Sequence, residues 1–259
     1  MDKPTAPQVA GLDLRPKHQF GYINPVLVSD FIHYQFYQIA PPLTHFVAYH
    51  INLQAFTKQG VDQALTAFWD AVNFLIARKV ERISLGGIPL SAYAGRPRVL
   101  ELLEEARKLT DIPVTTDFEE AILALRHLGV RRVVTAAKWD EPMMAAVVAY
   151  LRHAGMEVLG AVGETHNVQQ VAALRPGESI DIALQLGRSA FQRHPEADGL
   201  LLAGGAWLVL QAVPQLEAEF GKPVVTNPGS SYWAAMRQAG LHSPMRGLGR
   251  LLDGLRDTA

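Results

Sequence analysis

Two pairs of adjacent glycines are the clearest chemical signal in this sequence. Ile83-Ser84-Leu85 precedes Gly86-Gly87, and Leu200–Ala203 precedes Gly204-Gly205. Glycine at a strand end lets the backbone approach a ligand closely, and the N–H groups of a following helix attract an anion such as a carboxylate. A tight turn with nothing bound would explain either pair alone, but the repetition favours a binding site. Neither pair matches G-x-G-x-x-G or the Walker pattern, so nucleotide binding has weak support.

A few polar side chains could act beside these glycines. Lys138 could neutralise a substrate carboxylate, and Trp139 could form a flat wall or donate its indole N–H; the alternative is a surface lysine beside a packed aromatic ring. Asp117 could be a general base or the cap of the helix that follows it. Glu164 and His166 lie in a predicted loop, where solvation is the default. Ser91 lacks the G-x-S-x-G elbow of a nucleophile.

The absence of cysteine excludes several kinds of site. None of the 259 residues is cysteine, which excludes disulfides, Cys-ligated zinc, iron–sulfur clusters and thiol catalysis. His45 and His50 are five residues apart on a strand-like stretch, so they point to opposite faces. The sequence has no H-E-x-x-H and no strong metal-ligand spacing. We expect no metal and no external cofactor.

Charge and hydropathy exclude other partners. The formal net charge is −1, which gives no basic field for nucleic acid or an anionic membrane. No apolar run reaches about 18 residues, and the polar stretch over 1–17 lacks the apolar region of a signal peptide. We therefore expect a cytoplasmic protein whose partner is a small molecule; a homo-oligomer is compatible with the sequence.

Strands and helices alternate along the chain, which predicts an α/β fold. The predicted strands are 20–23, 44–51, 81–85, 114–116, 132–137, 156–162, 199–203 and 223–226. The predicted helices are 28–36, 61–79, 98–108, 118–127, 141–153, 179–194, 206–220 and 231–239, with a break over 175–177. Ligands of parallel sheets bind beyond the carboxyl ends of the strands. The strand-end residues should therefore ring one cleft.

The chain contains this arrangement twice. Each glycine pair is followed by a helix-like stretch, a Pro-Val strand and a further amphipathic helix. The repeat predicts two pseudo-symmetric lobes, each a mostly parallel sheet flanked by helices. One lobe would comprise 19–117 with 230–259 and the other 118–229, after a loose N-terminal arm over 1–18. The two glycine-rich strand ends should face each other across a small-molecule cleft.

Several segments resemble the aspartate/glutamate racemase superfamily, and within it the arylmalonate decarboxylases and maleate isomerases. The likeness covers most of the chain from Gly21 onward. It is strongest over Ser84–Ser91, Thr115-Thr116, Leu125–Val133, Asp198–Gly205, Ala212–Glu217, Gly221–Val225 and Gly247–Leu252. The resemblance implies the racemase-like fold, with two half-sites facing a planar intermediate, and it is closest to the decarboxylase branch.

The same resemblance shows which catalytic groups the chain lacks. In such racemases two thiols move protons on opposite faces; in the decarboxylases one thiol protonates an enediolate held by Thr, Ser and Tyr hydroxyls and backbone amides. The resemblance places Gly87 and Gly204 at the two thiol positions, Ile88-Pro89 at the Thr-Ser pair and Trp139 at the tyrosine. Removing one oxyanion donor typically costs about 3–4 kcal/mol, so the ordinary reaction of the family should be lost.

Two hypotheses about function stay open, beside a third possibility about the origin of the sequence. The preferred one is a cofactor-independent lyase or isomerase that acts on a small carboxylic or cyclic carbonyl compound through an enolate-like intermediate. Its catalytic residues would be Lys138, Asp117 and His166. Its substrate would contact Asn24, Gly87, Ile88, Pro89, Trp139, Gly204, Gly205 and Asn227. The alternative is a non-catalytic carboxylate-binding protein with an apolar cleft. Deliberate removal of cysteines is a third possibility.

Overall fold

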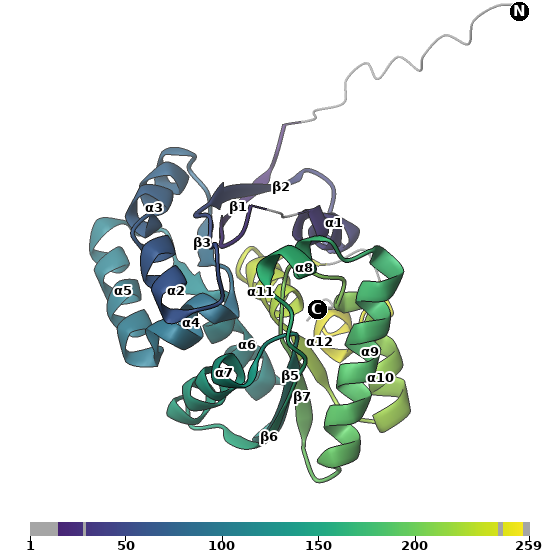
Figure 1. The fold of residues 1–259 in the computed structure, drawn as a ribbon. Helices are drawn as coiled ribbons and strands as arrows, with labels where there is room; N and C mark the ends of the chain where they lie inside the picture. The colour runs from purple at the N-terminus through teal and green to yellow at the C-terminus, as the bar shows by residue number, and fades with distance from the viewer. Residues whose placement is uncertain (1–14, 28–29, 243–245, 256–259) are drawn as a thin grey trace, which may run out of the picture.

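Two four-stranded parallel sheets form the centre of the protein (Figure 1). A computed structural model describes residues 15–27, 30–242 and 246–255; most of the predicted arm, 1–14, and the predicted helix start at 28–29 lie outside these ranges. The first sheet has the order β2-β1-β3-β4 and the second β6-β5-β7-β8, so the predicted α/β fold with two similar halves is confirmed. The strands are β1 (His18–Asn24), β2 (Thr44–His50), β3 (Arg82–Leu85), β4 (Val114–Thr116), β5 (Arg132–Ala137), β6 (Glu157–Gly163), β7 (Gly199–Leu202) and β8 (Val224–Thr226).

Helices cover the faces of both sheets. Figure 1 shows α9 and α10 on one side of the second sheet and α6 and α7 on the other. Among the described residues, no helix is long and apolar enough to cross a membrane. The helices are α1 (Asp30–Ile39), α2 (Lys58–Leu65), α3 (Phe68–Ala77), α4 (Ile88–Ala94), α5 (Arg96–Leu109), α6 (Asp117–His127), α7 (Glu141–His153), α8 (Val168–Ala172), α9 (Pro176–Arg193), α10 (Val213–Phe220), α11 (Asn227–Gln238) and α12 (Arg250–Asp253).

Two predicted helices are wrong in extent. The predicted helix over 61–79 is broken into α2 and α3 around Thr66, whose hydroxyl donates to the Gln63 carbonyl at 2.7 Å. The helix predicted over 206–220 begins only at Val213, after a short 3₁₀ turn. Distant side chains hold the preceding segment open: Leu208 N donates to Ser179 Oγ at 2.8 Å, and Val209 N donates to Gln35 Oε1 at 3.1 Å.

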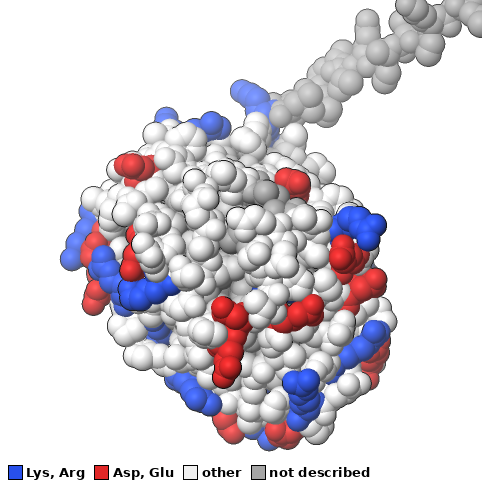
Figure 2. Space-filling model, viewed as in Figure 1, with Lys and Arg blue, Asp and Glu red and all other residues white. Residues whose placement is uncertain are grey.

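Shorter elements also differ from the prediction. Helices α4, α8 and α12 were not predicted. Helix α9 begins at Pro176, inside the predicted break, because proline is well suited to the first turn of a helix. The described part of the surface in Figure 2 mixes acidic and basic residues and shows no extended basic patch on this face.

The strand register defines which residues of the two halves correspond. Leu85 pairs with Thr116 in the first sheet, and Leu202 pairs with Thr226 in the second. Counting on from these pairs, Gly86-Gly87 corresponds to Ala203-Gly204 rather than to Gly204-Gly205. The second glycine pair is therefore displaced by one residue relative to the first.

The helices that follow β4 and β8 meet at the centre of the molecule. Helices α6 and α11 pack against each other, and α6 also contacts β4, β7 and β8. Because α6 contacts strands of both sheets, the predicted lobe boundaries stay a prediction.

A buried polar cluster ties both central helices to the first sheet. Glu120 on α6 accepts hydrogen bonds from Arg82 and Ser84 on β3 and from Ser231 on α11. Burial raises the pKa of Glu120, while the Arg82 guanidinium and the two hydroxyls act in the opposite direction. The cluster thereby fixes where the central helices begin relative to β3.

Replacing Arg82 with methionine should destabilise the protein strongly, because Glu120 would keep two hydroxyl donors but lose its cation. We expect the free energy of unfolding to fall by about 3–5 kcal/mol in urea denaturation. Arg98→Met is the matched control, since Arg98 forms exposed ion pairs with Glu101 and Glu105 and should change stability by less than about 1 kcal/mol. Equal effects of the two substitutions would refute the role of the cluster.

Candidate active site

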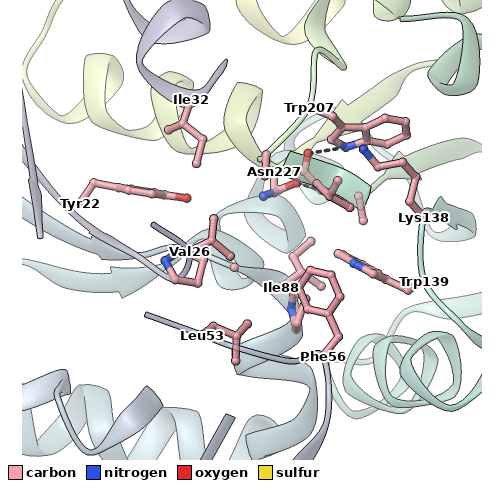
Figure 3. Close-up of a pocket in the computed structure, with 18 residues that line it drawn as sticks. Tyr22, Val26, Ile32, Leu53, Phe56, Ile88, Lys138, Trp139, Trp207 and Asn227 are labelled. Carbon is pink, nitrogen blue, oxygen red and sulfur yellow. Dashed lines mark hydrogen bonds between the residues drawn. The ribbon is translucent and has the colours of Figure 1, made fainter. Parts of the chain in front are cut away.

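A small apolar cavity lies where the strands of the two sheets end (Figure 3). Its volume is about 50 Å³, room for about four water molecules, so it suits a compact ligand. Apolar side chains form most of its wall, including Val26, Ile32, Leu53, Phe56, Ile88, Val171 and Trp207. Lys138 is the one Lys, Arg, His, Asp or Glu among the lining residues, all of which are described.

Eight of the predicted site residues line this cavity: Gly87, Ile88, Pro89, Lys138, Trp139, Gly204, Gly205 and Asn227. Three do not. Asn24 is fully buried beside His50, with its Nδ2 3.1 Å from His50 Nδ1. Asp117 is fully buried outside the cavity lining and accepts from Gly87 N. His166 lines a second hollow that shares only Phe56 and Trp139 with the cavity.

A hydrogen-bonded chain joins the two glycine loops through the central helices. Asp117 Oδ2 accepts from Gly87 N at 2.8 Å and from Asn227 Nδ2 at 2.9 Å. Asn227 Oδ1 accepts from Gly204 N at 2.7 Å. Asp117 and Asn227 are the first residues of α6 and α11. Each glycine loop is thus anchored by its own helix, and the two anchors bond to each other.

The predicted capping role of Asp117 is shifted by one residue. The cap of α6 is Thr116, whose hydroxyl accepts from Glu119 N at 3.1 Å. Asp117 is instead completely buried. Burial raises its pKa to about 7, although its bonds from Asn227 and Gly87 act in the opposite direction. The sequence could not show this, because burial depends on how α6 packs against α11.

Neither Gly87 nor Gly204, which the resemblance aligns with thiol positions, leaves space for a side chain. Gly87 has φ +87°, and a Cβ there would lie 2.7 Å from Pro25 Cγ. Gly204 has φ +125°, and a Cβ there would lie 2.3 Å from Trp207 Nε1. That indole nitrogen donates to Gly204 O at 2.9 Å. The indole therefore occupies the place that a residue-204 side chain would need.

Lys138 is buried without a polar partner. It is 3% exposed, and no described group forms a hydrogen bond with its Nζ. The amine lies 3.8 Å from the centroid of the Trp207 ring (Figure 3). Burial lowers the pKa of Lys138 to about 6, with partial opposition from Glu164. At neutral pH the predicted ammonium is therefore mostly a neutral amine until an anion enters.

Tyr22 is a site residue that the sequence analysis missed. It lines the cavity, and Figure 3 shows its hydroxyl pointing inward. No described residue forms a hydrogen bond with this hydroxyl. Burial raises its pKa well above the usual value, with a further contribution from Asp117, so it stays a proton donor. Its place near the end of β1 could have predicted that it lies at the cavity, by the strand-end rule. Nothing in the sequence indicated the position of Trp207.

The titration of Asp117 should appear in the stability of the protein. Between pH 3.8 and about 7 the folded protein holds a proton on Asp117 that the unfolded chain has lost. The protonated Asp117 contributes its full stabilisation below this range. As the pH rises through the range, the free energy of unfolding falls by roughly 4 kcal/mol.

Asp117→Asn keeps an oxygen that can accept from Gly87 N and removes the titration. The unchanged protein should lose stability as the pH rises from 3.8 to about 7, and the variant should not. In urea denaturation, the free energy of unfolding of the variant minus that of the unchanged protein should therefore increase with pH. A difference that is independent of pH would contradict the buried carboxyl group.

The chain is similar in sequence to known proteins. The family model for arylmalonate decarboxylase matches residues 35–252. The chain is 31% identical over 214 residues to arylmalonate decarboxylase of Bordetella bronchiseptica, which covers 80% of this chain and 86% of that protein. It is 28% identical over 157 residues to maleate isomerase of Pseudomonas putida, with 55% of each chain covered. These relatives are enzymes, in line with the preferred hypothesis.

Solved structures show the same fold. A liganded arylmalonate decarboxylase mutant, in which one glycine is cysteine and one cysteine is serine, superposes with a TM-score of 0.84 at 28% identity, covering 92% of this chain and 99% of that one. A maleate cis-trans isomerase of Nocardia farcinica superposes with a TM-score of 0.81 at 18% identity, covering 92% and 98%. The chain therefore belongs to the arylmalonate decarboxylase family, within the aspartate/glutamate racemase-like superfamily, and it does so without any cysteine.

Proposed function

We propose that the protein is a cofactor-independent lyase or isomerase that converts a small carboxylic acid through an enolate-like intermediate, with Lys138 in place of the thiol. The observation that carries this proposal is the unpartnered amine of Lys138 in the wall of the cavity between the glycine loops. The names of the relatives support the substrate class, since arylmalonate and maleate are carboxylates.

The charge of the substrate would set the protonation of Lys138. An entering carboxylate favours the charged form of a nearby amine, so the amine takes up a proton as the acid binds. The resulting ammonium attracts the carboxylate and stabilises charge that develops on it. Because burial makes Lys138 a stronger acid than an ordinary lysine, it can then give its proton to carbon.

A decarboxylation would proceed in two steps in this cavity. The bond between the α-carbon and one carboxyl group breaks, and its electron pair forms an enediolate with the remaining carboxyl group while CO₂ leaves. The Lys138 ammonium then protonates the α-carbon, and solvent reprotonates the amine. The Tyr22 hydroxyl, which points into the cavity in Figure 3, would donate a hydrogen bond to the enediolate oxygen. Asp117 is a positioning residue in this scheme, because it holds the Gly87 loop and Asn227.

The alternative is a carboxylate-binding protein without turnover. The apolar side chains of Ile88 and Pro89 in the cavity wall favour it, because they supply no hydroxyl donor. The roles first assigned to Asn24 and His166 stay predictions, and the positions of these residues outside the cavity give them no step here. The cytoplasmic location and a homo-oligomer likewise stay predictions.

Lys138→Met should stabilise the protein and abolish its activity. Between pH 10.5 and about 6 the unfolded chain keeps a proton on this lysine that the folded protein gives up, so burial lowers stability throughout that range. Methionine fills a similar volume without a charge. We expect a higher melting temperature than for the unchanged protein at neutral pH, and loss of turnover of any active substrate. A lower melting temperature would show that the lysine is retained for packing.

A substrate panel distinguishes the enzyme from the binding protein. Arylmalonates, maleate and hydantoins are tested by CO₂ release and by NMR of the products. For an active substrate, kcat/KM should fall about tenfold per pH unit above pH 6. Tyr22→Phe should lower kcat by about 10²–10³-fold with an unchanged melting temperature. If carboxylates raise the melting temperature and none reacts, the protein is a binder.

A further inference from the structure

We infer that Lys138 also acts as a nucleophile, forming an imine with a small 3-oxo acid, and that the cleft decarboxylates such an acid through an enamine. This inference rests on the proposed function, because it uses the same cavity. It goes further by naming a substrate class and a covalent step.

The surroundings of Lys138 leave its amine free to react. No described carboxylate pairs with it, and no described acceptor takes a hydrogen bond from it. Two other lysines show the contrast: Lys58 pairs with Asp62 at 2.8 Å, and Lys222 donates to the Pro195 carbonyl while lying 5.8 Å from the Phe191 ring. An aromatic ring therefore accompanies both Lys138 and Lys222, but only the second of these amines is also tied to an acceptor.

The cavity wall favours the nucleophilic form of this amine. A lysine desolvated in an apolar pocket loses its proton and becomes a nucleophile toward carbonyl carbon. Around Lys138 the wall is formed by Trp139, Trp207 and aliphatic side chains. The titratable groups that face it are the Glu164 carboxylate, which favours the charged form, and the Tyr22 hydroxyl across the cavity. With a pKa of about 6 for Lys138, the free-amine fraction at neutral pH is about 10³ times that of an ordinary lysine.

The reaction balances with the groups present and water. Lys138 Nζ attacks the carbonyl carbon at C3, an N–H proton moves to the oxygen, and uptake of one further proton releases water and leaves an iminium. The C1–C2 bond then breaks, CO₂ leaves, and the electron pair forms the C2–C3 double bond of the enamine as the nitrogen becomes neutral.

Protonation at C2 and hydrolysis complete the cycle. Figure 3 shows Tyr22 and Lys138 on opposite sides of the cavity, with Asn227 drawn between them in this view, so the proton for C2 comes from water that enters the cavity. Protonation of C2 regenerates the iminium, and water adds to C3 to release a ketone and the amine. Hydrolysis of the iminium returns one proton, so the sum is one 3-oxo carboxylate anion and one proton converted to one ketone and one CO₂.

Reductive trapping tests the covalent step. The full-length protein is incubated with acetoacetate and sodium cyanoborohydride at neutral pH, followed by intact-mass measurement and peptide mapping. We expect one reduced adduct, at Lys138, formed about 10²–10³-fold faster than at any other lysine. Lys138→Met, with its folding checked by circular dichroism, should give no such adduct. Lys222→Met is the matched control and should be labelled as the unchanged protein is.

The outcomes separate this inference from the proposed function. Labelling spread over surface lysines, or an adduct that persists in Lys138→Met, would overturn the imine. Release of CO₂ from acetoacetate without a trapped adduct would overturn it as well and leave the enolate-like route standing. Failure of the whole panel of carboxylic acids to bind or react, with Lys138 still labelled by acetoacetate, would overturn the proposed function and support the nucleophilic amine alone.

Discussion

The structure of the site depends on one hydrogen-bonded chain, from Gly87 through Asp117 and Asn227 to Gly204. Helices α6 and α11 pack against each other at the centre of the molecule, so their first residues meet there. Each of those residues accepts a hydrogen bond from the backbone N–H of the glycine loop in its own half. The separation of the two loops is therefore set by the contact between Asp117 and Asn227. A cavity bounded by both loops is a consequence of that contact.

The absence of a side chain at Gly204 and the buried amine of Lys138 belong to the same arrangement. Because Gly204 has no side chain, the Trp207 indole can approach its carbonyl closely enough to donate a hydrogen bond. The amine of Lys138 in turn lies over the face of that indole. A cysteine at position 204 would need the space of the indole nitrogen, and moving the indole would remove the surface on which Lys138 lies. Introducing a thiol here therefore means rebuilding the surroundings of the lysine.

Much of the fold could be predicted from the sequence because its signals are local. The apolar runs that end in glycine marked β3 and β7, and the strand-end rule brought Lys138 and Asn227 to one cavity. The positions that were missed depend on contacts between distant residues. Gln35 accepts from Val209 N at 3.1 Å across 174 positions of sequence, and such bonds keep Trp207 out of the predicted helix. The conformation of its loop places His166 in the neighbouring hollow. The periodicity of the sequence cannot predict a loop conformation.

Burial of the Lys138 amine costs free energy of folding, and side-chain packing alone does not explain why a lysine lies there. Its amine has neither a hydrogen bond nor an ion pair among the described residues, and the indole face offsets only part of the lost hydration. An apolar side chain of similar length would fill the same space at no such cost. The apolar surroundings that make burial of Lys138 unfavourable also keep its amine neutral. A neutral amine can react in either of the two proposed ways. In the proposed reactions, an acid without a ketone group offers the amine no electrophilic carbonyl carbon, so the amine takes up a proton and returns it to carbon. With a 3-oxo acid, the same lone pair meets an electrophilic carbon, so the substrate decides which chemistry follows.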